Sequence, residues 1–373
     1  MQIMFQGDPQ ALQNVIEALW SAAAARAWEF AAVAGGTIVA LTFLNAIAPH
    51  LDLIDHPDAL RKKHARAVPL TGGLAILCGV WIWSLAKMNF GDPVLPLIGI
   101  VTVIHAFDDH SGLSPRHRLM IDAVVALAFV MITRNAIETL GTSFGFDLIL
   151  GPLATPFTIL IYLALSNAFN MIDGVDGLAV TQFLITLFGV GIWHLLYARH
   201  SGFAPYAFSI TVAAIIVLIA NLGLLGRFLK CFLGDSGSRL LGFFLVYVLV
   251  AEGRRILSPI EAVYFVTFPL LDMCAVIVER ARAGARLMQG DRRHLHALLA
   301  DAGIPQGQVV LIIGAVSCSF IALFVIQHAL GLSHLVILAV FIGAACLYWR
   351  ARRSFVRAIV SRLSAHRMVG PAE

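Results

Sequence analysis

Residues 153–197 read LATPFTILIYLALSNAFNMIDGVDGLAVTQFLITLFGVGIWHLLY. Two apolar stretches, 153–170 and 178–197, flank a short polar segment rich in Asp and Gly. A helix needs about 20 apolar residues to cross the hydrocarbon core of a bilayer, which is about 30 Å thick. The pattern therefore predicts two membrane-spanning helices joined by a polar connection at one membrane surface.

The same alternation continues along the whole chain. Of its 373 residues, 59% are hydrophobic and 13% are charged, whereas about a quarter of a soluble domain is charged. The mean hydropathy is +0.86. We predict an all-α integral membrane protein with about 11 transmembrane helices, formed as a single polytopic membrane domain over 1–373, with a short lead-in at 1–26 and a basic cytoplasmic tail at 350–373. The predicted spans are about 27–48, 70–87, 93–107, 119–133, 153–170, 178–197, 205–223, 239–251, 259–278, 308–328 and 333–349.

The basic residues predict how the chain is oriented. The net charge is +4, and with eleven spans most Lys and Arg residues fall on one side, together with the C-terminus. Cytoplasmic loops carry such an excess, so this side is predicted to face the cytoplasm. The bias accounts for the positive charge without nucleic acid as a partner. The five scattered cysteines, with no CxxC pair, favour neither a disulfide framework nor a zinc site.

Five polar segments lie on the predicted cytoplasmic side. The first contains the basic run RKKH at 61–64 and a Gly pair at 72–73. It predicts either a loop that binds phosphate or lipid headgroups, or a plain basic anchor. The second ends an apolar span with Asp108 and Asp109. Adjacent carboxylates beside hydrocarbon are costly unless a partner such as a divalent cation compensates them, and the alternative is an Asp pair that caps the helix in water.

The third and fourth segments also combine carboxylates with glycines. Asn170, Asp173 and Asp176 recur every three residues, so on a helical turn their side chains would share one face. The intervening glycines suit a broken helix or a turn instead. In the fourth segment, LGDSGS, Asp235 can offer oxygen to a metal or cap a helix, and the two roles can coexist.

The fifth segment is basic and includes Arg280, Arg282, His294 and His296. Arginine suits bidentate recognition of phosphate. The two histidines would share a face in extended backbone but not on a helix. Zinc would need further ligands that the neighbouring sequence lacks. A diphosphate-binding loop therefore fits better, with a simple basic loop as the alternative.

Together the five segments place acids, a divalent-cation site and phosphate-binding cations on one membrane face. That combination is typical of phosphoryl transfer, where positioning and charge neutralisation dominate. An ion-coupled transporter would carry its acids near the middle of its spans, whereas these lie at span ends. A non-enzymatic lipid-binding protein would need the basic loops but not the repeated acids.

The motifs, in this order, resemble the polyprenyl-phosphate N-acetylhexosamine-1-phosphate transferases. The pieces that carry the resemblance span roughly 55–300 and are RKKHARAVPLTGG, the Asp pair at 108–109, NAFNMIDGVDGLA, NLGLLGRFLKCFLGDSGSRLLGF and DRRHLH. The chain looks most like the WecA type, and eleven spans also favour that type over the MraY type. The resemblance implies an Mg²⁺-dependent transfer of GlcNAc-1-phosphate from UDP-GlcNAc to undecaprenyl phosphate, with release of UMP, at the start of O-antigen or related surface glycan synthesis.

The resemblance also implies a role for each motif, with Mn²⁺ as an alternative metal. Asp235 would be the main metal ligand, with Asp108 and Asp109 beside the metal, and Asp108 would deprotonate or orient the lipid phosphate. Asp173 and Asp176 would position the nucleotide sugar. The substrate-binding residues would be Lys62, Lys63, Asn170, Arg280, Arg282, His294 and His296.

Several alternatives stay open at this point. The sugar could be GalNAc, QuiNAc or FucNAc, or the donor UDP-MurNAc-pentapeptide. The reaction could be a direct in-line attack or proceed through a phosphorylated aspartate. The resemblance places the protein in the bacterial inner membrane and allows a homodimer. Two residues depart from the family pattern: Ala297, where many relatives have a further His, and Asp122, where relatives often carry Gln.

Overall fold

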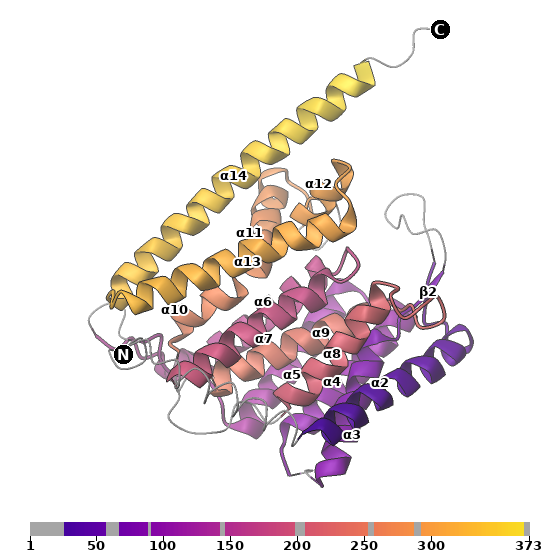
Figure 1. The fold of residues 1–373 in the computed structure, drawn as a ribbon. Coiled ribbons are helices and arrows are strands. Elements are labelled where there is room, and N and C mark those ends of the chain that lie inside the picture. Colours follow the sequence, from indigo (N-terminus) through magenta and orange to yellow (C-terminus); the bar gives the residue numbers. More distant parts are fainter. Residues whose placement is uncertain are drawn as a thin grey trace, which may run out of the picture.

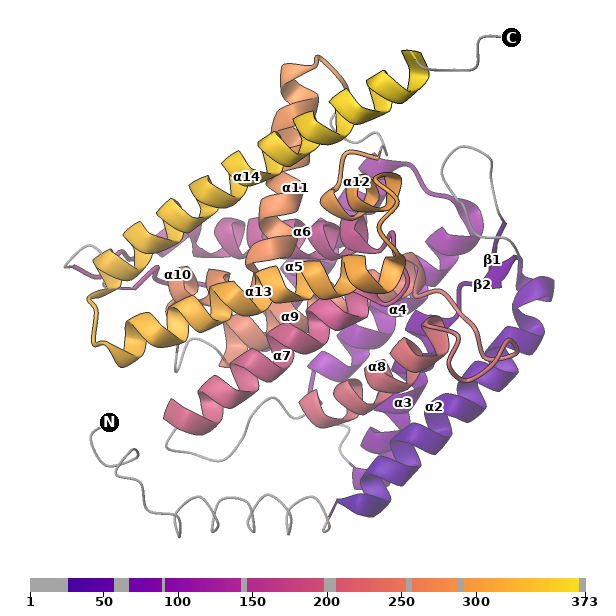
Figure 2. The same ribbon diagram turned by 45° about the horizontal axis from the view of Figure 1, so that its top comes forward.

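The computed structural model describes residues 26–56, 67–88, 91–141, 146–197, 206–252, 257–286 and 292–368. Helices dominate this part of the chain, and most of them run side by side in a bundle (Figure 1). Helices α2 (Ala27–Ile47) and α14 (His334–Met368) lie on opposite flanks in both views (Figures 1 and 2). The prediction of a helical membrane protein is confirmed at the coarse level of a mostly helical chain, whereas the predicted number of about 11 transmembrane helices is not confirmed.

The remaining elements complete the bundle and its connections. The other long helices are α3 (Gly72–Lys87), α4 (Val94–Ser111), α5 (Pro115–Thr133), α6 (Ala154–Ile172), α7 (Leu178–Tyr197), α8 (Ala207–Asn221), α9 (Gly234–Tyr247), α11 (Thr267–Arg282) and α13 (Gln306–Ala329). The short helices are α10 (Pro259–Ala262) and α12 (Leu295–Asp301), with 3₁₀ turns η1 (Ala48–Leu51), η2 (Gly151–Leu153) and η5 (Val263–Val266) and a π-helical turn η3 (Val248–Glu252). Strands β1 (Ile54–Asp55) and β2 (Val68–Pro69) form one antiparallel pair.

Every predicted span overlaps a helix, but the helices differ in their capacity to cross a membrane. In the described residues, six segments are long and apolar enough to do so: Ala27–Leu51, Gly151–Ile172, Leu178–Tyr197, Pro259–Arg282, Gln306–Ala329 and His334–Phe355. Helices α3 and α8 are apolar but shorter. The two predicted short spans extend into polar sequence, because α4 continues to Ser111 and α9 begins at Gly234.

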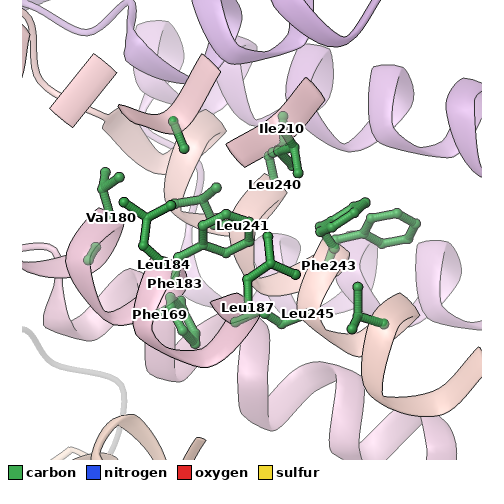
Figure 3. Packing of buried hydrophobic residues seen from close by; sticks show 14 of the residues in the cluster. Phe169, Val180, Phe183, Leu184, Leu187, Ile210, Leu240, Leu241, Phe243 and Leu245 are labelled. Atoms are coloured by element: carbon green, nitrogen blue, oxygen red, sulfur yellow. The ribbon is translucent and has the colours of Figure 1, made fainter. Parts of the chain in front are cut away.

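Helix α9 forms the centre of the bundle. Every residue from Ser236 to Tyr247 is buried, and the helix packs against α3, α4, α6 and α7. Figure 3 shows Leu241, Phe243 and Leu245 of α9 among side chains of the neighbouring helices. A helix enclosed on all sides must be apolar all round, which explains why the predicted span 239–251 is almost free of charge. Its one charged residue is Arg239.

The polar start of α9 is fixed by close backbone contacts. The N–H groups of Gly72 and Gly73 donate to the carbonyl oxygens of Phe232 and Leu233 at 3.0 and 3.1 Å. A Cβ atom on Gly73 would lie 2.3 Å from the backbone nitrogen of Gly237. Because Gly72 and Gly73 have no side chains, α3 and the start of α9 can approach each other closely. This contact fixes the position of the GDSGS segment.

Candidate active site

The polar motifs meet around one cavity of about 810 Å³. Its lining comes from the end of α4, the start of α5, the connection 173–176 between α6 and α7, the start of α9, and residue 292 before α12. The predicted site residues among the lining are Asp108, Asp109, Asn170, Asp173, Asp176 and Asp235. With Asp55 of β1, which also lines the cavity, chain segments far apart in sequence place six carboxylates around it.

Asp109 holds the first turn of α9. Its carboxylate accepts hydrogen bonds from the backbone N–H groups of Asp235 and Ser236, at 2.7 and 3.1 Å. The first N–H groups of a helix lack partners within the helix, and a carboxylate there also interacts favourably with the helix dipole. Gly234 has a φ of +74°, and a Cβ atom there would lie 2.6 Å from the Asp109 carboxylate. Residue 234 must therefore be glycine for two reasons: its φ is positive, and a Cβ atom would clash with the Asp109 carboxylate.

Asp235 is oriented from two sides. The Asn170 side-chain amide donates to one carboxylate oxygen at 2.7 Å, and the Arg118 guanidinium lies 2.7 Å from the other. Arg118 also lies 2.7 Å from Asp108, which further accepts the Leu113 N–H at 2.7 Å. One guanidinium therefore links the carboxylates of α4 and α9.

The segment 173–177 is a turn and not a continuous helical face. Helix α6 ends at Ile172, so Asn170 lies on the helix while Asp173 and Asp176 follow it. The broken-helix alternative is confirmed, and all three side chains still line the cavity. Burial, followed by the negative charges of Asp235, Asp109 and Asp176, raises the pKa of Asp173 to about 8. This part of the site therefore carries an excess of carboxylates.

Asp176 has a cationic partner that sequence reasoning did not select. The Lys230 ammonium donates to its carboxylate at 2.5 Å and also bonds the Asn221 carbonyl. The Asn221 side chain in turn accepts the Gly177 N–H and donates to the Cys231 carbonyl. The connection before α7 is thereby tied to the segment that precedes α9.

The two predicted histidines stack on each other. Their ring centroids are 5.6 Å apart with an interplanar angle of 8°. His294 has extended backbone angles, which agrees with the prediction that the pair shares a face only in extended chain. His294 Nδ1 lies 2.7 Å from the Asp272 carboxylate, and the His296 ring lies against Gly174 of the 173–177 turn.

His296 is uncharged at neutral pH in this environment. Burial and the nearby His294 lower its pKa to about 4, assisted by Arg292 and opposed by Asp272. Arg292 lines the cavity and makes a two-point contact with Asp301 at 3.0 and 2.7 Å. The basic segment is therefore adjacent to the acidic cavity.

The remaining predicted residues are not found at the cavity in the part of the chain that the structure describes. Lys62 and Lys63 lie outside the described residues. Arg280 is buried and Arg282 is exposed at the end of α11, and neither is among the cavity-lining residues. Sequence reasoning missed Arg118, although Ser114 and Pro115 are a typical helix start that places it in the first turn of α5 close after the Asp pair.

Known proteins are similar to this chain along most of their length. The model of glycosyl transferase family 4 matches residues 93–252. The undecaprenyl-phosphate alpha-N-acetylglucosaminyl 1-phosphate transferase of Yersinia pestis is 31% identical over 328 residues, which cover 83% of this chain and 89% of that protein. The chain belongs to this family of transferases. Proteins of the same name from Escherichia coli (strain K12) and Pasteurella multocida (strain Pm70) are 29% and 30% identical, over 90% and 74% of this chain and 95% and 80% of theirs.

The charge of Asp122 is compensated inside the fold of this transferase. Asp122 is fully buried and pairs with Arg239 of α9, and His105 Nε2 lies 3.0 Å from the same carboxylate. Arg239 also donates to Asn167 at 3.3 Å. Ala297 is buried in the first turn of α12. The segment 292–301 therefore carries two histidines, the stacked pair His294 and His296.

The donor set of the transferase cavity suits a hard divalent cation. Mg²⁺ takes carboxylate oxygens, usually one or two from protein, and completes its shell with water and substrate phosphate. Asp235, Asp108 and Asp109 supply such oxygens at the cavity wall. Within the described residues, no group of three acidic, His or Cys side chains is close enough to form a complete metal site.

Proposed function

We propose that this chain transfers GlcNAc-1-phosphate from UDP-GlcNAc to undecaprenyl phosphate and releases UMP, as the first step of O-antigen or related surface glycan synthesis. The observation that carries the proposal is the convergence of carboxylates from α4, the 173–176 turn and α9 on one cavity, with Arg118 and Arg292 in the same lining. Relatives named for this reaction align with most of the chain.

The proposed chemistry is a direct in-line displacement. An oxygen of undecaprenyl phosphate attacks the sugar-linked β-phosphorus, the new P–O bond forms, and the bond to the bridging oxygen breaks as UMP leaves. Bound Mg²⁺, or Mn²⁺, would neutralise the diphosphate and polarise its P–O bonds, held by Asp235 with Asp108 and Asp109 beside it. Such transfers depend mainly on positioning and charge.

Each side chain of the site has its own role in this proposal. Asp109 keeps the first turn of α9, and with it Asp235, in place. Asp108 is nearly fully buried and is paired with Arg118. We therefore assign it the orientation of the lipid phosphate through Arg118 and not proton abstraction. Asn170, Asp173 and Asp176 position the nucleotide sugar, while Arg292, His294 and His296 contact the diphosphate side.

The location of the site also supports a membrane orientation. We propose eleven spans in the bacterial inner membrane, with the C-terminus and the cavity on the cytoplasmic side, because UDP-GlcNAc is water-soluble and the acceptor phosphate lies at the membrane surface. The cavity acids lie at helix ends and in connections, which disfavours an ion-coupled transporter. Lys62 and Lys63 would meet the lipid phosphate at the same surface.

The decisive experiment measures UMP release by the purified full chain with undecaprenyl phosphate and Mg²⁺. UDP-GlcNAc, UDP-GalNAc and UDP-MurNAc-pentapeptide are supplied separately, each with and without EDTA. We expect lipid-dependent UMP from UDP-GlcNAc that EDTA abolishes. Release from another donor alone would replace the sugar in the proposal, and folded protein without UMP from any donor would overturn it. A trapped phosphoaspartate or ping-pong kinetics would replace the direct attack by the two-step route.

A further inference from the structure

The last helix of the chain reaches the basic segment through one arginine. Arg352 of α14 is only 3% exposed. Its guanidinium donates to the backbone carbonyl of Arg293 at 2.6 Å and to the Glu279 carboxylate. Its Nε lies 3.5 Å from the Asp272 carboxylate. Arg352 therefore joins α14, α11 and the segment 292–296, which we call the basic loop.

The contacts of Asp272 continue this connection into the histidine pair. One carboxylate oxygen lies 2.7 Å from His294 Nδ1, and the other accepts the Leu295 N–H at 3.0 Å. Asp272 is fully buried on α11. The basic loop is thus held at three consecutive residues: the Arg293 carbonyl by Arg352, and the His294 ring and Leu295 N–H by Asp272.

The anchored peptide follows a residue that lines the cavity and lies close to one that packs on the cavity wall. Arg292, directly before the anchored carbonyl, lines the cavity, and His296 lies against Gly174 of the turn that also lines it. A guanidinium can donate to a carbonyl and a carboxylate from one rigid plane while its charge lies close to a second carboxylate, whereas a lysine ammonium cannot reproduce that fork. A rotation of the loop peptide would move Arg292 and the histidines together.

We propose that Arg352 is a positioning residue that holds the basic loop in the conformation that binds the nucleotide diphosphate. The proposal rests on the proposed function for the identity of the donor, and it assigns to the last helix a part in donor binding. It concerns the nucleotide side alone, because Arg352 contacts neither α4 nor α9, which carry the carboxylates proposed to face the metal and the lipid phosphate.

The test compares Arg352→Met and Arg352→Lys with Arg350→Met, which removes an exposed charge from the same helix. For Arg352→Met we expect the KM for UDP-GlcNAc to rise about tenfold, while the KM for undecaprenyl phosphate stays within about twofold. The Lys variant should recover part of the loss, and Arg350→Met should match the unmodified protein. A merely structural role would lower the amount of active protein without separating the two KM values.

Two measurements keep the proposal independent of turnover. Calorimetric titration with UDP should show weaker binding for Arg352→Met, and hydrogen exchange should be faster in peptides covering 292–301. If the unmodified protein binds UDP but releases no UMP, the proposed function fails while this comparison still tests Arg352. If Arg352→Met does not fold, the same measurements are made on Arg352→Lys and Glu279→Gln. Unchanged UDP affinity and loop exchange in folded variants would overturn the proposal.

Discussion

Two groups of charges lie on neighbouring turns of α9 and behave in opposite ways. Asp235 is part of the cavity wall, where its side chain is 24% exposed. Arg239, one turn later, is fully buried and pairs with Asp122, which also contacts His105. Both groups join α9 to α4 and α5. The first leaves carboxylates facing an open cavity, whereas the second satisfies its charges internally.

The difference identifies which charges are available to a ligand. In the buried group, acid and base are matched, so no outside charge is needed. In the cavity, the carboxylates exceed the cations that contact them. Burial, followed by the charges of the neighbouring carboxylates, raises the pKa of Asp173. An excess of acid at an open cavity is the arrangement in which a divalent cation lowers the energy. The comparison predicts that the first group governs activity and the second governs stability.

The largest effect is expected from Asp235→Asn, which keeps the side-chain shape and removes its charge. We expect kcat to fall about 1000-fold, because the main proposed metal ligand is lost. The thermal midpoint should not fall, since repulsion between Asp235, Asp109 and Asp173 is relieved. UMP release and thermal unfolding in detergent measure the two effects. Glu138→Gln, an exposed acid remote from the cavity lining, is the control. More than a tenth of the activity in Asp235→Asn would remove Asp235 from its proposed role.

The next largest effect concerns the buried pair. Asp122→Asn should destabilise the fold by about 3 kcal/mol, because it leaves Arg239 buried without a matching charge. The double variant Asp122→Asn/Arg239→Gln should recover most of that loss, since neither remaining side chain is charged. Thermal unfolding of the two single variants and the double variant measures the coupling. Additive losses would mean that the two charges are not coupled.

Much of the bundle could be predicted from the sequence, because crossing hydrocarbon imposes a pattern on each helix by itself. Stretches such as 178–197 need no partner to be identified as apolar. The exact number of crossings could not be predicted in this way, because α4, α5 and α9 carry charges that only their packed neighbours compensate. Helix α9 is enclosed by other helices and so depends on tertiary packing.

The residue types of the site were also predictable, whereas their pairings were not. Asp108, Asp109 and Asp235 were conspicuous because carboxylates beside apolar spans need compensation. For Asp108 and Asp235 the compensating cation is Arg118, and for Asp176 and Glu279 it is Lys230 and Arg352 respectively. In the sequence these three residues look like ordinary loop or tail cations. Each of these cations and its partner lie in different segments of the chain. Spacing along one chain segment carries no information about such contacts.

Arg118 provides a smaller test of the cavity charges, because its guanidinium joins Asp108 to Asp235. Arg118→Met should lower kcat/KM by about 10- to 100-fold, the range for a lost charge-assisted contact. Arg118→Lys should lose less, because it keeps the charge without the fork. Arg116→Met, an exposed arginine in the same helical turn, should behave like the unmodified protein. Equal losses in Arg116→Met and Arg118→Met would show that only the net charge of the loop matters.

The smallest effect is expected from His296. This residue is buried like Asp122, but its Nδ1 has no hydrogen-bond partner in the described chain. Its pKa is about 4 in the folded protein, against an ordinary value of 6.5. Between these values only the unfolded state binds the proton, so His296 lowers stability as the pH falls below about 6.5 and has no such effect above it. At pH 6 the loss of folding stability should be less than about 1 kcal/mol.

His296→Gln should remove this part of the pH dependence in thermal unfolding, while His50→Gln at an exposed site on η1 should leave it unchanged. An unchanged slope in His296→Gln would mean that the histidine accepts the proton without cost in the fold, and that the basic loop is more open than its packing against Gly174 indicates.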